Sequence, residues 1–143
     1  MIYKSGALNP NSRLGMLRAN ELYEQIRKRR TDYVNVARHT KFSLEQCKIV
    51  KNYIFLDSHE LSVGYRRFFP DLAMAQSWLR LSEKDGNRIL QHDVILLYHE
   101  LTEISYLVRI SEMTQAEAHN KAEELYNYSE ACKQYYSKLG IRL

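Results

Sequence analysis

Five side chains of the kinds that carry acid–base or metal chemistry lie within one short apolar stretch: His92, Asp93, His99, Glu100 and Glu103. Because an α-helix advances about 100° per residue, positions seven apart lie nearly in line. His92, His99 and Glu103 would form one stripe, and Asp93 and Glu100 a second stripe about a quarter turn away. Five such groups on a partly covered surface indicate a pocket, where pKa values shift toward catalytic use. The alternative is an ordinary solvated helix face, with His99 and Glu103 in simple surface contact.

The same stretch predicts an apolar helix face on the opposite side, directed at the core. Its members are Val94, Leu97, Leu101, Ile104 and Val108. Leu96 and Leu107 fall between the two polar stripes, which predicts that the polar side is partly covered as well.

The spacing His99-Glu100-x-x-Glu103 resembles the zinc-protease motif HExxH, with Glu in place of the second His. Zinc accepts a carboxylate ligand, so a zinc site made of His99, Glu103 and His92 is one hypothesis. A metal-independent site with no cofactor is the preferred one.

In the metal-independent hypothesis the chain cleaves RNA with two proton-transfer groups. His59 lies in an expected loop beside Asp57 and Glu60, and an imidazole titrates near neutrality. We expect His59 and His99 to exchange protons, with Glu100 or Glu103 orienting one ring. Arg80 would stabilise the charge on the phosphate.

Basic and aromatic residues supply candidate contacts to nucleic acid. Arg66 and Arg67 form a small basic patch that can attract phosphates, and Tyr126 can stack on a base. Helical tyrosines also commonly pack with only the hydroxyl exposed, which is the alternative for Tyr126.

Periodicity and capping signals predict a mainly α fold: a single compact helical domain of about five to six helices, with one long loop at about 56–70. Residues 1–13 are expected to be an irregular lead-in or linker, and 14–143 the domain. The expected helices span about 14–30, 34–39, 44–55, 72–81, 92–110 and 115–137. Ser43 with Gln46 and Thr114 with Glu117 match capping boxes, and Asp71 is an expected cap. A β-hairpin within 55–69 stays open, because no strong strand period is present.

Composition narrows the class of protein. The chain has 143 residues, 45% hydrophobic residues, only two prolines and five glycines, and a net charge of +4, which favours one helical globular domain. Cys47 and Cys132 belong to no CxxC motif, so a disulfide scaffold is not expected, although one long-range disulfide stays open. No run approaches the roughly 18 apolar residues of a membrane span, and the N-terminus lacks the apolar core of a signal peptide.

Several segments, taken in order, resemble a known family. They are Ser5-Gly6-Ala7-Leu8-Asn9-Pro10, Lys51-Asn52-Tyr53-Ile54-Phe55-Leu56-Asp57-Ser58-His59-Glu60-Leu61, Arg67-Phe68-Phe69-Pro70-Asp71, Ala75-Gln76-Ser77-Trp78-Leu79-Arg80-Leu81, His92-Asp93-x-x-Leu96-Leu97-x-His99-Glu100-x-x-Glu103, Glu117-Ala118-His119 and Tyr126-Asn127-Tyr128. Together they resemble the C-terminal domain of phage minor head (MuF-type) proteins and of LXG-type and other polymorphic toxins of Gram-positive bacteria. The chain departs from that pattern with His59-Glu60-Leu61 in place of an HDL and with an extra Phe before Pro70.

The resemblance implies a toxin domain, in several relatives a nuclease, that acts in the cytoplasm of a target cell. A separate module, a secretion system or a phage particle would deliver it, and a cognate immunity protein would bind it. The resemblance adds Trp78 and His119 to the candidate substrate-binding residues. RNA is the expected partner ahead of DNA, and no membrane is expected. A non-enzymatic interaction domain of the phage head is the alternative.

Overall fold

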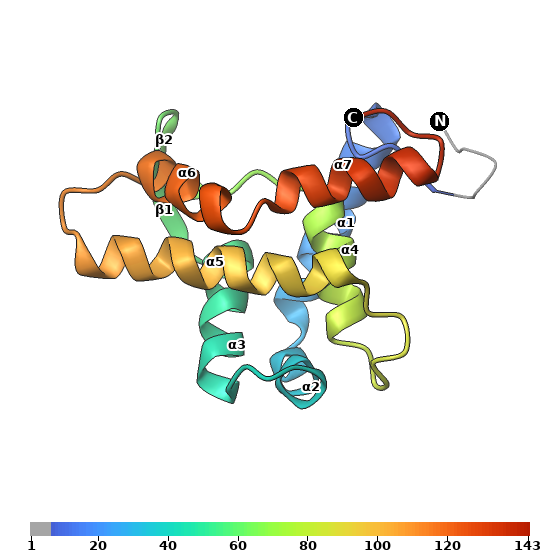
Figure 1. Ribbon diagram of the computed structural model, residues 1–143, viewed down its shortest axis with the longest axis horizontal. Coiled ribbons are helices and arrows are strands. Elements are labelled where there is room, and N and C mark those ends of the chain that lie inside the picture. Colours follow the sequence, from blue (N-terminus) through green and yellow to red (C-terminus); the bar gives the residue numbers. More distant parts are fainter. Residues whose placement is uncertain (1–6) are drawn as a thin grey trace.

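The computed structural model describes residues 7–143, and this part of the chain is mainly α-helical (Figure 1). Its elements are α1 (Arg13–Lys28), α2 (Asp32–His39), α3 (Leu44–Lys51), the π-helical turn η1 (Asn52–Leu56), β1 (Ser58–Leu61), β2 (Gly64–Arg67), α4 (Leu72–Leu81), α5 (Gln91–Arg109), α6 (Gln115–Leu125) and α7 (Tyr128–Lys138). The expected mainly α class is confirmed. Residues 1–6 of the expected lead-in lie outside the described part.

The helix starts follow the capping signals of the sequence. The side chains of Ser43 and Thr114 each accept a hydrogen bond from the backbone three residues on, and each forms a complete capping box. Asp71 accepts from the backbone N–H of Met74 at the start of α4. A cap of this kind contributes about 1 kcal/mol, so these residues fix where α3, α4 and α6 begin.

The expected single helix over 115–137 is wrong: the chain forms two helices with a break at Tyr126 and Asn127. Asn127 accepts a hydrogen bond from the backbone N–H of Glu130 at 2.9 Å and so begins α7. The cap competes with continuation of α6, and the break accounts for one helix beyond the expected five to six in the described residues.

The expected loop at 56–70 contains a short antiparallel hairpin. Strands β1 and β2 pair with Ser58 opposite Arg67, and Gly64 has a φ of 121° where the chain reverses. That φ favours glycine, which explains Gly64 at this turn. Strand β1 packs against α6 (Figure 1).

Helix α5 is central to the fold and contacts α3, α4, α6 and α7 (Figure 1). Most of the expected apolar face does pack against the core, with Leu97 fully buried and Val94, Leu101 and Ile104 partly buried, but the polar side is buried more completely than expected. The buried residues of α5 are His92, Asp93, Leu96, Leu97, His99, Glu100 and Glu103. Val108 of the expected core face is 79% exposed. The polar stripes therefore face the protein interior.

The main core lies where α1, α3, η1 and α4 meet, and Tyr23, Ile26, Phe55 and Trp78 are fully buried there. Within it, the ammonium group of Lys51 lies 2.5 Å from a carboxylate oxygen of Asp32 and also donates to the Arg29 carbonyl. The indole N–H of Trp78 donates to the other oxygen of Asp32 at 2.9 Å. Each polar group of this buried ion pair thus has a partner, as burial requires.

Cys47 and Cys132 are both buried free thiols, so they form no disulfide with each other. Burial raises the pKa of Cys47 to about 11 and that of Cys132 to about 12. No helix in residues 7–143 is long and apolar enough to cross a membrane.

Candidate functional site

Three ligand-type atoms from α5 and α6 form a compact triangle. Nε2 of His99 lies 3.2 Å from Nδ1 of His119 and 3.4 Å from Oε1 of Glu103, and the latter two atoms lie 3.0 Å apart. His99 and Glu103 are one helical turn apart on α5, and the packing of α6 against α5 brings His119 onto them. We call these three residues the His–Glu cluster.

Every outward-facing atom of the His–Glu cluster has a partner. Nδ1 of His99 donates to the Tyr126 carbonyl at 2.9 Å. Nε2 of His119 lies 3.0 Å from Oε2 of Glu123. The second oxygen of Glu103 accepts from the Tyr53 hydroxyl and, at 3.3 Å, from the Gln115 amide. These contacts hold both rings and the carboxylate in fixed orientations.

The break between α6 and α7 makes the contact to His99 possible. A continuing helix would direct the Tyr126 carbonyl to an amide four residues on, whereas here that oxygen accepts from the ring of His99. Since a carbonyl oxygen only accepts, Nδ1 of His99 carries a proton and Nε2 of the neutral ring keeps its lone pair. That lone pair is directed into the triangle.

The electrostatics of the cluster favour negative Glu103 and positive His119. Burial opposes ionisation of Glu103, but its contacts with His119, His99, Tyr53 and Gln115 outweigh burial and lower its pKa to about 2. The hydrogen bond to Glu103 raises the pKa of His119 above its usual range, against burial and with help from the charge of Glu123. The negative charges of Glu103 and Glu123 thus stabilise a positive charge on the His119 ring.

A pocket of about 310 Å³ opens beside the cluster. Its lining includes His99, Glu100, His119 and Glu123, together with Lys133 from α7. Glu100 is only 5% exposed. Burial raises its pKa well above the usual range, and the charges of Glu103 and Glu123 raise it further. A carboxyl group in such a position is suited to proton transfer.

Arg80 does not lie with His99. Its guanidinium forms a two-bond ion pair with Asp93, both bonds 2.8 Å long, and its Nη2 lies 3.2 Å from Nε2 of His92. Asp93 also accepts from the backbone N–H of Leu90 and caps the start of α5. His92 and Asp93 precede His99 by seven and six residues, roughly 10 Å along the helix axis. The expected roles of Arg80 in phosphate stabilisation and of His92 as a zinc ligand are therefore not supported.

His92 at this helix start predicts a pH effect on stability. His92 is buried, and burial lowers its pKa below the usual value, with the charge of Arg80 adding to the effect and Asp93 opposing it. Below about pH 6.5 His92 is protonated in the unfolded chain but stays neutral in the folded chain. The free energy of unfolding therefore falls as the pH falls. The effect is at most about 1.4 kcal/mol per pH unit.

We expect His92→Gln, which keeps an acceptor for Arg80, to show a smaller loss of stability between pH 7 and pH 5 than the wild type. Urea unfolding at a series of pH values measures the difference. Equal slopes in the two proteins would contradict the effect.

His59 lies outside the His–Glu cluster as well. Its Nε2 lies 2.8 Å from the Tyr53 carbonyl, and its ring stacks on Phe68 at 4.1 Å between centroids. It lines a separate hollow of about 380 Å³ with Tyr65 of the hairpin. The expected proton exchange between His59 and His99 is not supported, because the Tyr53 side chain lies between His59 and Glu103.

The candidate substrate-binding residues fall into three groups. Trp78 is fully buried and bonded to Asp32, so it is a core residue and its proposed contact to substrate is wrong. Arg66 and Arg67 are exposed on β2, and neither lines the 310 Å³ pocket. His119 lines that pocket, and Tyr126 contacts the cluster through its carbonyl.

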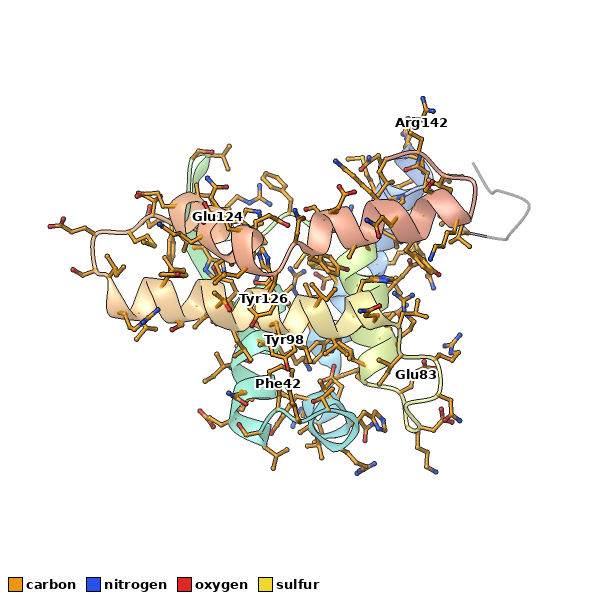
Figure 2. All side chains as sticks on the ribbon, viewed as in Figure 1. Phe42, Glu83, Tyr98, Glu124, Tyr126 and Arg142 are labelled. Carbon is orange, nitrogen blue, oxygen red and sulfur yellow. The ribbon has the colours of Figure 1, made fainter. Side chains whose placement is uncertain are left out.

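Tyr126 also belongs to a column of aromatic side chains that crosses α5, as Figure 2 shows for Phe42, Tyr98 and Tyr126. The rings of Tyr98 and Tyr126 stack at 5.0 Å, and Phe42 meets Tyr98 edge-on at 4.9 Å. The ammonium group of Lys41 lies 5.2 Å from the centre of the Tyr98 ring. Sequence reasoning did not single out Phe42 or Tyr98, because they belong to elements far apart in the chain.

Four polar residues of the site were not singled out by the sequence analysis: Tyr53, Gln115, Glu123 and Lys133. A usable signal was present for Glu123, which follows His119 by four residues and so shares its helix face. No local pattern marks Tyr53, whose hydroxyl meets Glu103 fifty residues later in the chain.

Comparisons of the chain with protein-family models, with curated proteins and with solved structures find no match. The function of the pocket is therefore inferred from its chemistry.

Proposed function

We propose that this chain is a toxin domain that cleaves RNA in the pocket beside the His–Glu cluster. The observation that carries the proposal is the convergence of His99, Glu100 and His119 on one pocket. Two imidazoles and a buried carboxyl group in one concave site are the groups that general acid–base chemistry at neutral pH requires. The resemblance to toxin domains supplies the substrate class.

The reaction needs one proton acceptor and one proton donor. The 2′-hydroxyl oxygen of the ribose attacks the neighbouring phosphorus and gives its proton to one site group, and the bond from phosphorus to the 5′-oxygen breaks. A second site group gives a proton to that leaving oxygen, so protons and charge balance. Glu100 is the proposed proton-transfer group, because it lines the pocket and is almost fully buried on α5.

Positive charge next to the pocket supports a nucleic-acid substrate. Lys133 lines both the pocket and a neighbouring hollow of about 710 Å³, whose lining also includes Lys138 and Arg142. Arg142 extends from the C-terminal end of the chain (Figure 2). Such cations bind phosphates with an affinity that falls as salt rises. The aromatic column of Phe42, Tyr98 and Tyr126 adjoins the cluster and offers a surface for bases.

The proposal is tested by incubating the purified chain with total RNA and with DNA, alongside expression in cells. We expect RNA to be shortened, DNA to be spared and growth to stop. Intact RNA and DNA under all ionic conditions, together with normal growth, would count against an enzyme and favour the non-enzymatic interaction domain.

The contribution of the neighbouring cations is tested by Lys133→Glu. We expect this variant to reduce kcat/KM for RNA about tenfold at low salt. Because one phosphate contact is lost, the slope of log(kcat/KM) against log[salt] should also become shallower by about one. Lys84→Glu is the matched control, because Lys84 is exposed in the segment between α4 and α5 and lines neither hollow. Equal losses in both variants would mean that net charge alone matters.

A further inference from the structure

We propose that His99, Glu103 and His119 bind a divalent transition-metal ion of the zinc class. The proposal concerns the pocket of the proposed nuclease, and it rests on that function only for what the ion would do there, not for whether the ion binds.

The distances in the triangle match those between ligands of one ion. Three atoms at about 2.0–2.2 Å from a zinc ion in a tetrahedral arrangement stand roughly 3.3–3.5 Å apart, and somewhat closer at higher coordination number. The three edges here are 3.0, 3.2 and 3.4 Å. Two imidazole nitrogens and one carboxylate oxygen form a ligand set that zinc uses in catalytic sites.

The orientation of each ligand fits an ion better than a network of hydrogen bonds alone. Zinc-binding imidazoles bind through one nitrogen and donate the other N–H to a carbonyl or a carboxylate. His99 donates its Nδ1–H to the Tyr126 carbonyl, and His119 can donate its Nε2–H to Glu123. The free oxygen of Glu103 is held by Tyr53 and Gln115. The three atoms that remain are those of the triangle.

Hydrogen bonds leave one conflict at the centre that an ion removes. With Nδ1 of His99 protonated, its Nε2 presents a lone pair toward the triangle, where Glu103 also presents lone pairs. The Nδ1–H of His119 is the one donor between these two acceptors. Nδ1 lies 3.2 Å from Nε2 of His99 and 3.0 Å from Oε1 of Glu103. A metal ion in place of that proton would contact all three atoms at once.

Glu123 is assigned to positioning His119 and not to the ligand set. One ligand atom each from His99, His119 and Glu123 can be chosen within 4.8 Å of one another. The direct contact from Glu123 to the far nitrogen of the His119 ring instead matches the carboxylate–histidine–metal arrangement.

The spacing along the chain gives the ion a chemical role. His99 and Glu103 occupy the ligand positions of the HExxH pattern with a carboxylate in the second position, and Glu100 follows the first ligand directly. His99 and His119 also line the pocket. An ion there would be placed to polarise a phosphoryl oxygen, with Glu100 beside it to move the proton.

The test uses the full chain, purified without a nickel column, stripped with chelator and titrated with zinc sulfate in a calorimeter. We expect one zinc ion per chain with a micromolar or tighter Kd. His119→Ala should weaken binding at least 100-fold, and because the His119 side chain is half-exposed, its truncation should leave the protein folded. Glu123→Gln should weaken binding about 10–100-fold, the effect of losing an orienting partner.

His59→Ala is the matched control, since His59 lies in a separate hollow, and it should bind zinc like the wild type. Circular dichroism checks that each variant is folded. A folded wild type that binds no zinc, or equal binding by the wild type and His119→Ala, would overturn the metal site.

The two proposals fail in distinguishable ways. Zinc binding that depends on His119 but comes without cleavage of RNA supports the metal site and counts against the nuclease. Cleavage by protein that binds no zinc, unchanged by EDTA, supports the nuclease and overturns the metal site.

Discussion

Glu100→Gln is expected to lower the rate of RNA cleavage about 10²–10⁴-fold, the usual contribution of a positioned proton-transfer group. The substitution keeps the size and shape of the side chain and removes its ability to exchange a proton. The expected effect falls on kcat, because RNA would still meet the cations beside the pocket. Single-turnover cleavage of a defined RNA measures the change.

Stability separates this catalytic effect from a folding defect. Glu100 is buried at 5% exposure near Glu103 and Glu123, so a neutral amide there should leave the melting temperature equal or higher. Glu124→Gln is the control, because Glu124 is exposed on α6 (Figure 2) and outside the lining of the pocket. Full activity in Glu100→Gln would remove Glu100 from the mechanism, and a matching loss in Glu124→Gln would point to a general effect of charge.

The second large effect concerns stability and lies in the core. Lys51→Met is expected to lower the free energy of unfolding by about 3–5 kcal/mol, because it leaves the buried carboxylate of Asp32 without its ion partner. Trp78 would still donate to Asp32, but one hydrogen bond does not offset a buried charge. Urea unfolding with an unchanged m-value measures the loss.

A double variant distinguishes the unpaired charge from the loss of packing. Asp32→Asn combined with Lys51→Met removes both charges and keeps an oxygen for the Trp78 indole. It should recover most of the stability that Lys51→Met alone loses, since a neutral replacement of a buried ion pair is often tolerated. A double variant no more stable than Lys51→Met would assign the loss to packing around Lys51.

Local signals in the sequence predict the helices well because capping is a local interaction. Ser43, Asp71 and Thr114 each bond to a backbone amide three residues away. The break at Tyr126 and Asn127 was missed because asparagine caps compete with an otherwise continuous helical pattern. The sequence pattern does not predict the hairpin, because β2 is exposed on all four residues and carries no alternation of apolar and polar residues.

How completely the polar face of α5 is buried could not be predicted from hydrophobicity alone. Hydrophobic patterning assumes that polar groups remain in water, yet Asp93 and Glu103 are almost fully buried. Arg80 forms an ion pair with the Asp93 carboxylate, and His119 and Tyr53 bind the Glu103 carboxylate. Because those partners come from α4, α6 and η1, only the tertiary structure reveals how completely the polar face is buried.

The candidate site was predicted in its α5 half only. His99, Glu100 and Glu103 were singled out because their spacing places them on one helix, which sequence can show. The expected partners His59 and Arg80 belong to other elements, and the structure directs them to Tyr53 and Asp93 instead. Their proposed convergence depended on the packing of helices, which no spacing along the chain specifies.

The contact between His99 and the Tyr126 carbonyl has a consequence for mutational scanning and for divergence among homologues. The interacting atom belongs to the main chain, so any residue at position 126 can supply it as long as α6 ends there. An alanine scan would register only the loss of ring stacking against Tyr98 and would assign position 126 no part in orienting the imidazole. Insertion or deletion of one residue between Leu125 and Tyr128 would reveal the role of this carbonyl in orienting His99, because it displaces the carbonyl and leaves every side chain of the cluster unchanged.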